Sequence, residues 1–262
     1  MTKIVGILNI TPDSFSDGGK FLDVKAALQQ VEIMLAQGAD VIDIGAQSTR
    51  PQAETISHEE EWFRLEPVLK EIRSSASKVE ISIDSFYPQT IRKALDYNIS
   101  IINDVTGFYS SEMKKLAAET GKKIIFMHSL TIPVDKNINL PEYTDVINFL
   151  KDWAEKKTRE LEYNGIKKDK LIFDPGIGFG KTPKQSLQIA LHAEKFNDLG
   201  VEVMIGHSEK SFMSLFTENQ AGKRNVETHI FSYLLARKKV NYLRVHDVEG
   251  NKRAVNLAKY LL

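Results

Sequence analysis

The chain has 262 residues, and its 35 Lys and Arg residues balance 35 Asp and Glu residues, so its net charge is zero. This balance gives no overall electrostatic attraction for nucleic acid or an anionic membrane, and we expect neither as a partner. The chain has no cysteine, which excludes disulfides, thiolate metal sites and cysteine nucleophiles and agrees with a cytoplasmic location.

Short β-branched runs alternate with longer amphipathic stretches from one end of the chain to the other. This alternation is typical of parallel strands joined by crossover helices. We expect eight strands, at residues 4–10, 41–44, 80–84, 100–103, 123–127, 171–174, 201–205 and 242–245. Most are apolar on both faces, as buried parallel strands are. The helical stretches include 26–35, 62–72, 91–95 and 146–161, whose apolar residues recur every three or four positions.

The number of strands favours an α/β fold of the (β/α)8 barrel type as a single domain over residues 1–262. A doubly wound sheet shows the same alternation, so the positions of the polar residues carry the distinction. Polar residues lie at or just beyond the carboxyl ends of the expected strands: Asn9, Asp43, Asp84, Asn103, Asp104, His128, Asp174, Arg244 and His246. In a closed barrel these ends converge on the face that carries the active site.

Several loops at these strand ends have the residue types of a binding site. Asn9 precedes a polar loop and could offer its amide oxygen to Mg2+, although a surface loop explains most of that segment. The run from Asp174 to Thr182 ends in Gly-Lys-Thr, but Pro175 stands where a phosphate-binding loop needs glycine. We interpret this run as a tight turn whose glycines let the backbone approach a flat ligand beneath Phe179.

The last two strands end in cationic and hydroxyl groups. Loops after the seventh and eighth strands of such barrels often bind phosphate. Arg244 and His246 alternate along a strand and are expected to point to one side, where they could hold a pyrophosphate together. A surface ion pair for Arg244 and a stray polar role for His246 remain the alternatives.

Taken in order, these segments resemble the dihydropteroate synthase family over nearly the whole chain. The motifs are GILNITPDSFSDGG (6–19), GADVIDIGAQSTRP (38–51), ISIDS (81–85), INDV (102–105), MH (127–128), DPGIGFGKT (174–182), the GxSxKS element (206–211) and LRVHDV (243–248). The resemblance implies a barrel enzyme, commonly a homodimer. It would use Mg2+ to condense 6-hydroxymethyl-7,8-dihydropterin pyrophosphate with p-aminobenzoate, releasing pyrophosphate in folate biosynthesis.

The resemblance also implies a role for individual residues. It assigns the pterin diphosphate to Thr49, Asp84, Asn103, Asp174, Lys210, Arg244 and His246, p-aminobenzoate to Thr49, Arg50, Pro51, Phe179, Lys210 and Ser211, magnesium to Asn9, and catalysis to Asp84, Lys210, Arg244 and His246. In the implied mechanism pyrophosphate leaves first and Asp84 stabilises the pterin cation that remains. The amine of p-aminobenzoate then attacks.

Some positions depart from the family pattern. Glu209 stands where the family usually has arginine, which reverses a charge beside Lys210 and is expected to lower affinity for p-aminobenzoate. We expect sensitivity to sulfonamides. Two other functions remain open: a catalytically silent pterin-binding paralogue, favoured by Glu209, and a methyltetrahydrofolate:corrinoid methyltransferase, which would have less use for Arg244, His246 and the loop at 12–19.

Overall fold

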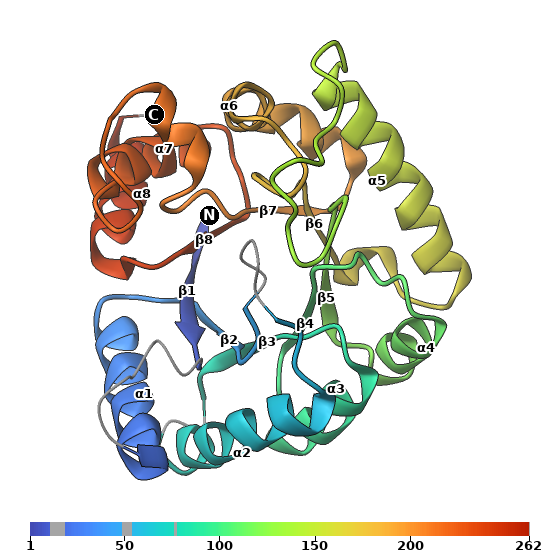
Figure 1. Cartoon of the computed structure of the whole chain (residues 1–262), viewed down its shortest axis with the longest axis vertical. Coiled ribbons are helices and arrows are strands. Elements are labelled where there is room, and N and C mark those ends of the chain that lie inside the picture. The colour runs from blue at the N-terminus through green and yellow to red at the C-terminus, as the bar shows by residue number, and fades with distance from the viewer. Residues whose placement is uncertain (11–18, 49–53, 76–77, 262) are drawn as a thin grey trace.

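The eight strands close into a barrel in which each strand runs parallel to its neighbours in chain order (Figure 1). The structure is a computed structural model that describes residues 1–10, 19–48, 54–75 and 78–261. The strands are β1 (Lys3–Asn9), β2 (Val41–Gly45), β3 (Glu80–Asp84), β4 (Ile101–Asp104), β5 (Lys123–Met127), β6 (Leu171–Asp174), β7 (Glu202–Ile205) and β8 (Tyr242–Val245). This confirms the expected barrel, with strand ends shifted by one residue in β1, β2, β4 and β7.

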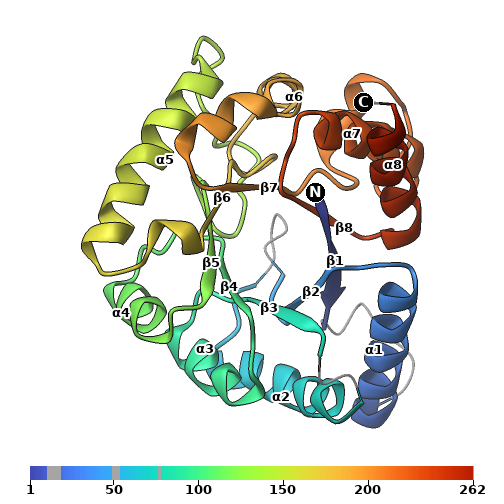
Figure 2. The ribbon, with the colours of Figure 1, turned by 180° about the vertical axis from the view of Figure 1, so that it is seen from behind.

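The helices form a ring outside the barrel, as both views along it show (Figures 1 and 2). They are α1 (Gly19–Ala36), α2 (His58–Ser75), α3 (Pro88–Ala94), α4 (Ser111–Thr120), α5 (Val146–Tyr163), α6 (Pro183–Leu191), α7 (Asn225–Arg237) and α8 (Val248–Tyr260). Short 3-10 helices are η2 (Leu95–Tyr97), η3 (Lys168–Lys170), η4 (Ala193–Leu199) and η5 (Ser211–Leu215). Among the described residues, no helix is long and apolar enough to cross a membrane.

Local sequence signals set where helices begin and end. The hydroxyl of Ser110 accepts a hydrogen bond from the backbone N–H of Met113, which caps the start of α4. Gly121 ends that helix in the left-handed region at φ 60°. Thr182 and Gln185 form a reciprocal capping box at the start of α6. These caps place the loops before each helix, and therefore the strand ends, at defined positions.

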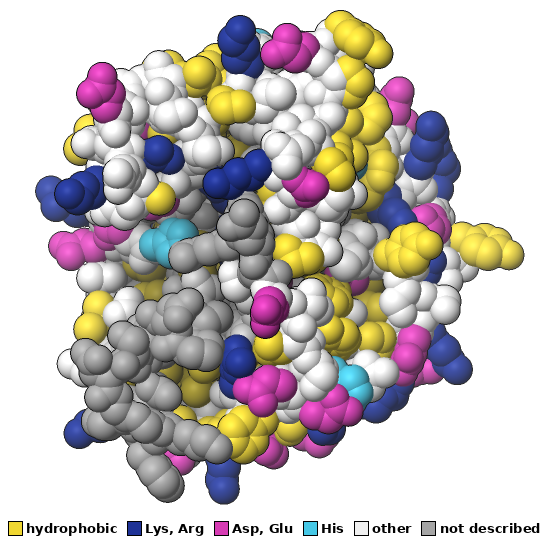
Figure 3. Space-filling model, in the orientation of Figure 1, with side chains coloured by type: hydrophobic (Ala, Val, Ile, Leu, Met, Phe, Trp, Pro, Cys, Tyr) yellow, Lys and Arg dark blue, Asp and Glu magenta, His cyan; other side chains and the backbone are white. Residues whose placement is uncertain are grey.

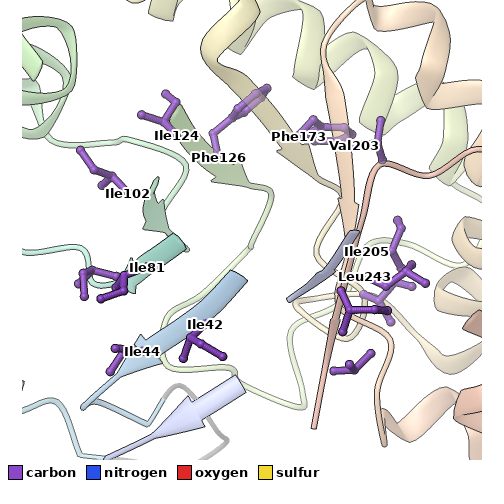
Figure 4. Packing of buried hydrophobic residues seen from close by; sticks show 14 of the residues in the cluster. Ile42, Ile44, Ile81, Ile102, Ile124, Phe126, Phe173, Val203, Ile205 and Leu243 are labelled. Carbon is purple, nitrogen blue, oxygen red and sulfur yellow. The ribbon is translucent and has the colours of Figure 1, made fainter. Parts of the chain in front are cut away.

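Two apolar clusters hold the barrel together because side chains alternate between the two faces of each strand. The outer cluster lies between strands and helices, and Figure 4 shows members such as Ile42, Phe126 and Leu243 around the barrel. The inner cluster consists of Val5, Val41, Ile101, Ile125, Ile172, Met204 and Tyr242. Burying an apolar side chain of this size stabilises the fold by about 1.5–3 kcal/mol relative to leaving it exposed. Because the residues of both clusters are buried, a strand that turned over would lose this stabilisation, and the direction of each side chain is therefore fixed.

The amino end of the barrel is closed by side chains from the first residues of the strands. Tyr242 is 2% exposed and its hydroxyl accepts a hydrogen bond of 2.9 Å from the Lys123 ammonium. Lys123 also pairs with Glu202, and the Lys3 ammonium lies 5.9 Å from the centre of the Tyr242 ring. These side chains fill the amino end of the barrel, so a ligand reaches the interior from the carboxyl end. Figure 3 shows the face at the carboxyl ends of the strands, where cationic and acidic side chains are interspersed.

Candidate active site

Strand periodicity places a ring of polar side chains inside the carboxyl end of the barrel. On four strands a polar residue comes two positions after a residue of the inner apolar cluster, so both side chains point inward. The pairs are Val41 and Asp43, Ile101 and Asn103, Ile172 and Asp174, and Tyr242 and Arg244. Asp84 joins the ring because it pairs in register with Asn103. Four of the predicted site residues, Asp84, Asn103, Asp174 and Arg244, are therefore brought together.

Arg244 lies between two carboxylates of this ring. Its Nε donates to Asp43 Oδ2 at 2.6 Å and its Nη2 donates to Asp84 Oδ2 at 2.8 Å. Asn103 Nδ2 donates to both oxygens of Asp43 at 3.3 Å. Asp43 is fully buried and was left without a role in the sequence interpretation. Its position two residues after the inward Val41 is the signal that would have identified it.

Asp84 shares the Arg244 guanidinium with Asp43, and burial perturbs the pKa of Asp84. Burial raises the pKa of Asp84 to about 7, the Arg244 charge acts against this shift, and the nearby Asp43 adds to it. Burial also disfavours the charge on Arg244, but Asp43 and Asp84 outweigh it and leave the pKa of Arg244 raised. Burial and the neighbouring Asp43 thus bring the pKa of Asp84 close to neutral pH.

Asp174 ends β6 and is held by the turn that follows it. Its Oδ1 accepts from the backbone N–H of Gly176 at 2.8 Å. Burial raises the pKa of Asp174, while this hydrogen bond and the nearby Lys210 and Arg244 charges oppose the shift. Asp174 is buried, with 5% of the residue exposed. Its hydrogen bond to Gly176 therefore fixes the carboxyl group before any ligand binds.

Lys210 and Phe179 meet at the edge of the ring. The Lys210 ammonium lies 4.5 Å from the centre of the Phe179 ring, which is within cation–π range. Ser211, the next residue, is exposed and begins η5. These three predicted p-aminobenzoate residues are therefore neighbours, on the rim and above the inward ring.

His246 lies two residues beyond Arg244 but at the exposed rim. Its backbone N–H donates to Ser208 Oγ at 3.3 Å, and the same hydroxyl lies 3.0 Å from His246 Nδ1. The hydroxyl of Ser208 thus accepts from the backbone N–H and shares a hydrogen bond with Nδ1, whose direction depends on the tautomer of the ring. The structure thus places Arg244 inside the mouth and His246 above it; their joint hold on pyrophosphate stays a prediction.

Two of the strand-end residues face away from the mouth. Asp104 follows the inward Asn103 and therefore points outward, where its Oδ1 accepts from the backbone N–H and hydroxyl of Thr106 at 2.8 and 2.7 Å. His128 packs its ring edge-to-face against Trp153 of α5, with ring centres 4.9 Å apart. The expectation that all strand-end polar residues share one rim was therefore wrong for these two, because strand alternation sends every second side chain outward.

A buried pair of His128 and Lys181 was not anticipated from the sequence. The Lys181 ammonium donates to the His128 carbonyl oxygen at 2.8 Å and lies 2.7 Å from Nδ1. Burial lowers the pKa of Lys181 well below its usual value and, with the lysine charge, lowers the pKa of His128 to about 3. The ammonium of Lys181 is therefore occupied by contacts with His128.

The glycines after Asp174 serve packing as much as ligand approach. Gly176, Gly178 and Gly180 all have positive φ, between 69° and 80°. A Cβ at Gly176 would lie 2.0 Å from the His128 carbonyl oxygen, and one at Gly180 would lie 2.5 Å from Leu130. Only Gly178 is open on the side of Lys210. The close approach that we attributed to a ligand is, at two of the three positions, an approach of the neighbouring loop.

Part of the predicted site lies outside the described residues. Thr49, Arg50 and Pro51 of the second loop are among these, as is the loop at 11–18. Asn9 is described and ends β1, where it pairs in register with Gly45, which in turn pairs with Asp84 of β3. The predicted metal ligand is therefore two strands away from Asp84.

A closed parallel barrel with fixed acidic, amide and guanidinium groups inside one end defines a barrel enzyme that takes a small polar ligand into its mouth. The pterin binding enzyme family matches residues 5–246 of this chain. The chain belongs to this family and, within it, to the dihydropteroate synthases.

Individual relatives agree with this assignment. A folate synthesis bifunctional protein from Chlamydia caviae is 40% identical over 99% of the chain, which spans 59% of that relative's length. A dihydropteroate synthase from Anaplasma phagocytophilum, solved with bound 6-hydroxymethylpterin-monophosphate, is 37% identical with a TM-score of 0.91 and covers 100% of this chain and 99% of its own. One from Xanthomonas albilineans, solved with 4-aminobenzoic acid, is 31% identical, covers 99% and 93%, and has a TM-score of 0.91.

Proposed function

We propose that this chain is a transferase that joins 6-hydroxymethyl-7,8-dihydropterin pyrophosphate to p-aminobenzoate, giving 7,8-dihydropteroate and pyrophosphate. The observation that carries the proposal is the ring of Asp84, Asn103, Asp174 and Arg244 inside a barrel of this family. The solved relatives with a pterin monophosphate and with 4-aminobenzoic acid support the same pair of substrates.

The ring has the chemistry that a pterin edge requires. A pterin presents both N–H donors and ring acceptors, and Asp84 and Asp174 can accept while Asn103 can do both. All three sit on strand ends and are fixed by neighbours before binding, so little ordering is needed. An analogue without those groups would leave buried polar atoms unmatched. We assign pterin recognition to these residues together with Lys210.

The reaction needs positive charge to be tolerated at the pterin methylene after pyrophosphate departs. The Asp84 carboxylate is placed to stabilise that charge, and Arg244, held between Asp43 and Asp84, is placed to attract the departing diphosphate with His246. Lys210, Phe179 and Ser211 would hold p-aminobenzoate at the rim, with Thr49, Arg50 and Pro51 as the facing wall. Positioning and electrostatics then account for catalysis without a protein nucleophile.

Magnesium fits this site as a partner of the diphosphate. The residues described in the structure contain no cluster of three His, Cys, Asp or Glu side chains placed to hold a metal. Mg2+ is commonly bound by one or two protein oxygens plus phosphate oxygens and water. The amide oxygen of Asn9 would be the protein ligand, and the bound ion would neutralise charge on the diphosphate.

We also propose that the protein is a homodimer and acts in the cytoplasm. Val226 and Ile230 lie one turn apart on α7 and are exposed, as are Leu257 and Tyr260 on the neighbouring α8. Exposed apolar groups gathered on paired helices are typical of a subunit interface. The cytoplasmic location rests on the absence of cysteine and on soluble substrates.

Pyrophosphate release is the measurement that tests the function. The purified protein is incubated with Mg2+ and the dihydropterin pyrophosphate, with and without p-aminobenzoate. We expect pyrophosphate and dihydropteroate in equal amounts when both substrates are present, and inhibition by a sulfonamide that p-aminobenzoate relieves. A silent pterin-binding paralogue would not release pyrophosphate, and neither would a corrinoid-linked methyltransferase. If no pyrophosphate is released with both substrates present, the proposal is refuted.

A further inference from the structure

Glu209 has a backbone conformation that requires stabilisation by its surroundings. Its φ is 59°, in the left-handed region that disfavours side chains with a Cβ. Its carboxylate accepts from the backbone N–H of Gly222 at 2.7 Å and from that of Arg224 at 3.1 and 3.0 Å. Its own N–H donates to Thr228 Oγ1 at 3.2 Å. The charge of Glu209 is therefore directed at backbone amides of the segment before α7.

Arg224 returns the contact from that segment. Its Nη1 donates to the carbonyl oxygens of Glu209 and Lys210, at 3.4 and 3.1 Å. Its Nε donates to the carbonyl oxygen of Asn219 at 2.7 Å. We call this reciprocal set of bonds between Glu209 and Arg224 the 209–224 clamp. It ties the loop after β7 to the segment 219–224.

The clamp acts on the backbone of residues that face the second substrate. The Lys210 carbonyl oxygen accepts from Arg224 in the clamp, and the Lys210 N–H donates to the His207 carbonyl oxygen at 3.2 Å. The side chain of Lys210 then reaches 4.5 Å from the Phe179 ring, and Ser211 follows directly. A change in the clamp would therefore shift these groups relative to one another. The side chains of Asp84, Asn103 and Asp174, which lie on the strand ends, would stay in place.

We propose that Glu209 and Arg224 are positioning residues for p-aminobenzoate, because the clamp fixes Lys210 and Ser211 against Phe179. The proposal rests on the proposed function and names a contribution to its second substrate. It is opposite in sign to the expectation from charge alone, in which an acid beside Lys210 weakens binding. In this chain the acid strengthens binding, since its charge is satisfied by the amides of Gly222 and Arg224.

Steady-state kinetics of four variants test whether Glu209 strengthens or weakens the binding of p-aminobenzoate. Glu209→Arg restores the usual family residue but removes the carboxylate that accepts in the clamp. Arg224→Ala removes the guanidinium that donates to the carbonyl oxygens of Glu209 and Lys210, while the backbone N–H of residue 224 remains. We expect both to raise the KM for p-aminobenzoate by about tenfold, the value for losing hydrogen bonds to a charged group. Glu209→Gln keeps one acceptor oxygen, so its KM for p-aminobenzoate should lie between that of the parent protein and that of Glu209→Arg. Glu218→Gln removes the same charge from an exposed position in the same segment and should match the parent protein.

The KM for the dihydropterin pyrophosphate separates positioning from a general loss of folded protein. We expect it to rise by a smaller factor than the KM for p-aminobenzoate, because Lys210 is the one assigned pterin-binding residue among those that the clamp holds. A loss of folded protein would instead lower kcat and leave both KM values unchanged. The combined variant Glu209→Arg with Arg224→Ala should be no worse than either single change. A lower KM for p-aminobenzoate in Glu209→Arg, or an unchanged KM in both Glu209→Gln and Arg224→Ala, would overturn the proposal.

Amide hydrogen exchange keeps this test independent of activity. In the parent protein, peptides covering 216–224 should exchange slowly at Gly222 and Arg224, and Glu209→Gln should speed that exchange whereas Glu218→Gln should not. Exchange that is equally fast in all three proteins would show that the clamp does not form. A parent protein that makes no dihydropteroate but shows this exchange pattern would refute the proposed function and leave the clamp itself established.

Discussion

Replacing Asp84 with asparagine removes one negative charge at the place where the proposed reaction develops a positive one. Asparagine keeps the shape and one acceptor oxygen, and Arg244 retains its 2.6 Å bond to Asp43, so the ring should stay assembled. Two unit charges about 4 Å apart interact by about 4 kcal/mol at the effective dielectric of a partly buried site. At about 1.4 kcal/mol for each factor of ten, this corresponds to roughly a 100- to 1,000-fold fall in kcat.

Initial rates of pyrophosphate and dihydropteroate formation measure this effect, at saturating concentrations of both substrates. We expect the KM for the pterin substrate to change less than about threefold, since Asn still pairs with the pterin edge. Asp40→Asn is the control, because Asp40 is also a paired aspartate but lies at the amino end of β2: its Oδ2 accepts from the Ile4 N–H at 2.7 Å and from Lys252 at 2.9 Å. It should cost stability without lowering kcat. A kcat for Asp84→Asn within tenfold of the parent would refute the electrostatic role.

Three other predictions concern packing, pH and assembly. Gly176→Ala should lower the free energy of unfolding in urea by at least about 3 kcal/mol more than Gly121→Ala, because both have positive φ but only Gly176 would bring its Cβ within 2.0 Å of a carbonyl oxygen. Burial lowers the pKa of His207 from 6.5 to about 4. Between these two pH values the unfolded chain binds a proton at this histidine and the folded chain does not, so the free energy of unfolding should fall by about 3 kcal/mol as the pH is lowered from about 6.5 to about 4. His207→Gln should lessen that loss in urea titrations at several pH values, whereas the part-exposed His192→Gln should not. Ile230→Asp, on the exposed face of α7, should convert the proposed dimer to a folded monomer in light scattering, and an unchanged mass would contradict the assigned interface.

The strands and the inward ring were accessible from the sequence because both depend on local patterns. The run 171–174 is apolar, short and followed by Pro175 and Gly176, which is enough to define β6 and to place Asp174 at its end. Strand alternation then decides which residues face inward, and it would have added Asp43 to the site and shown that Asp104 points outward. That step requires knowing which residue of each strand is in the inner cluster, and a strand that is apolar on both faces does not show this in its sequence.

Contacts between distant segments were not accessible in the same way. His128 and Lys181 are 53 positions apart, and each looks like an ordinary strand-end or loop residue until the turn at Gly176 brings them together. Glu209 was judged by its neighbour in sequence, Lys210, although its carboxylate is satisfied by amides 13 and 15 positions later. Charge patterns along a chain indicate which groups are present, whereas their partners depend on tertiary structure.

Tyr242, Lys123 and Glu202 close the amino end of the barrel in the part of the chain that the structure describes, so ligands enter from the carboxyl end. Under the proposed activity the pterin lies on the inward ring and p-aminobenzoate lies above it at the rim, so the pterin substrate has to bind first. Pyrophosphate has to leave through the same opening that p-aminobenzoate then occupies. A molecule that binds only at the rim would trap the pterin beneath it, so inhibitors of that kind should bind more tightly as the concentration of the pterin substrate rises.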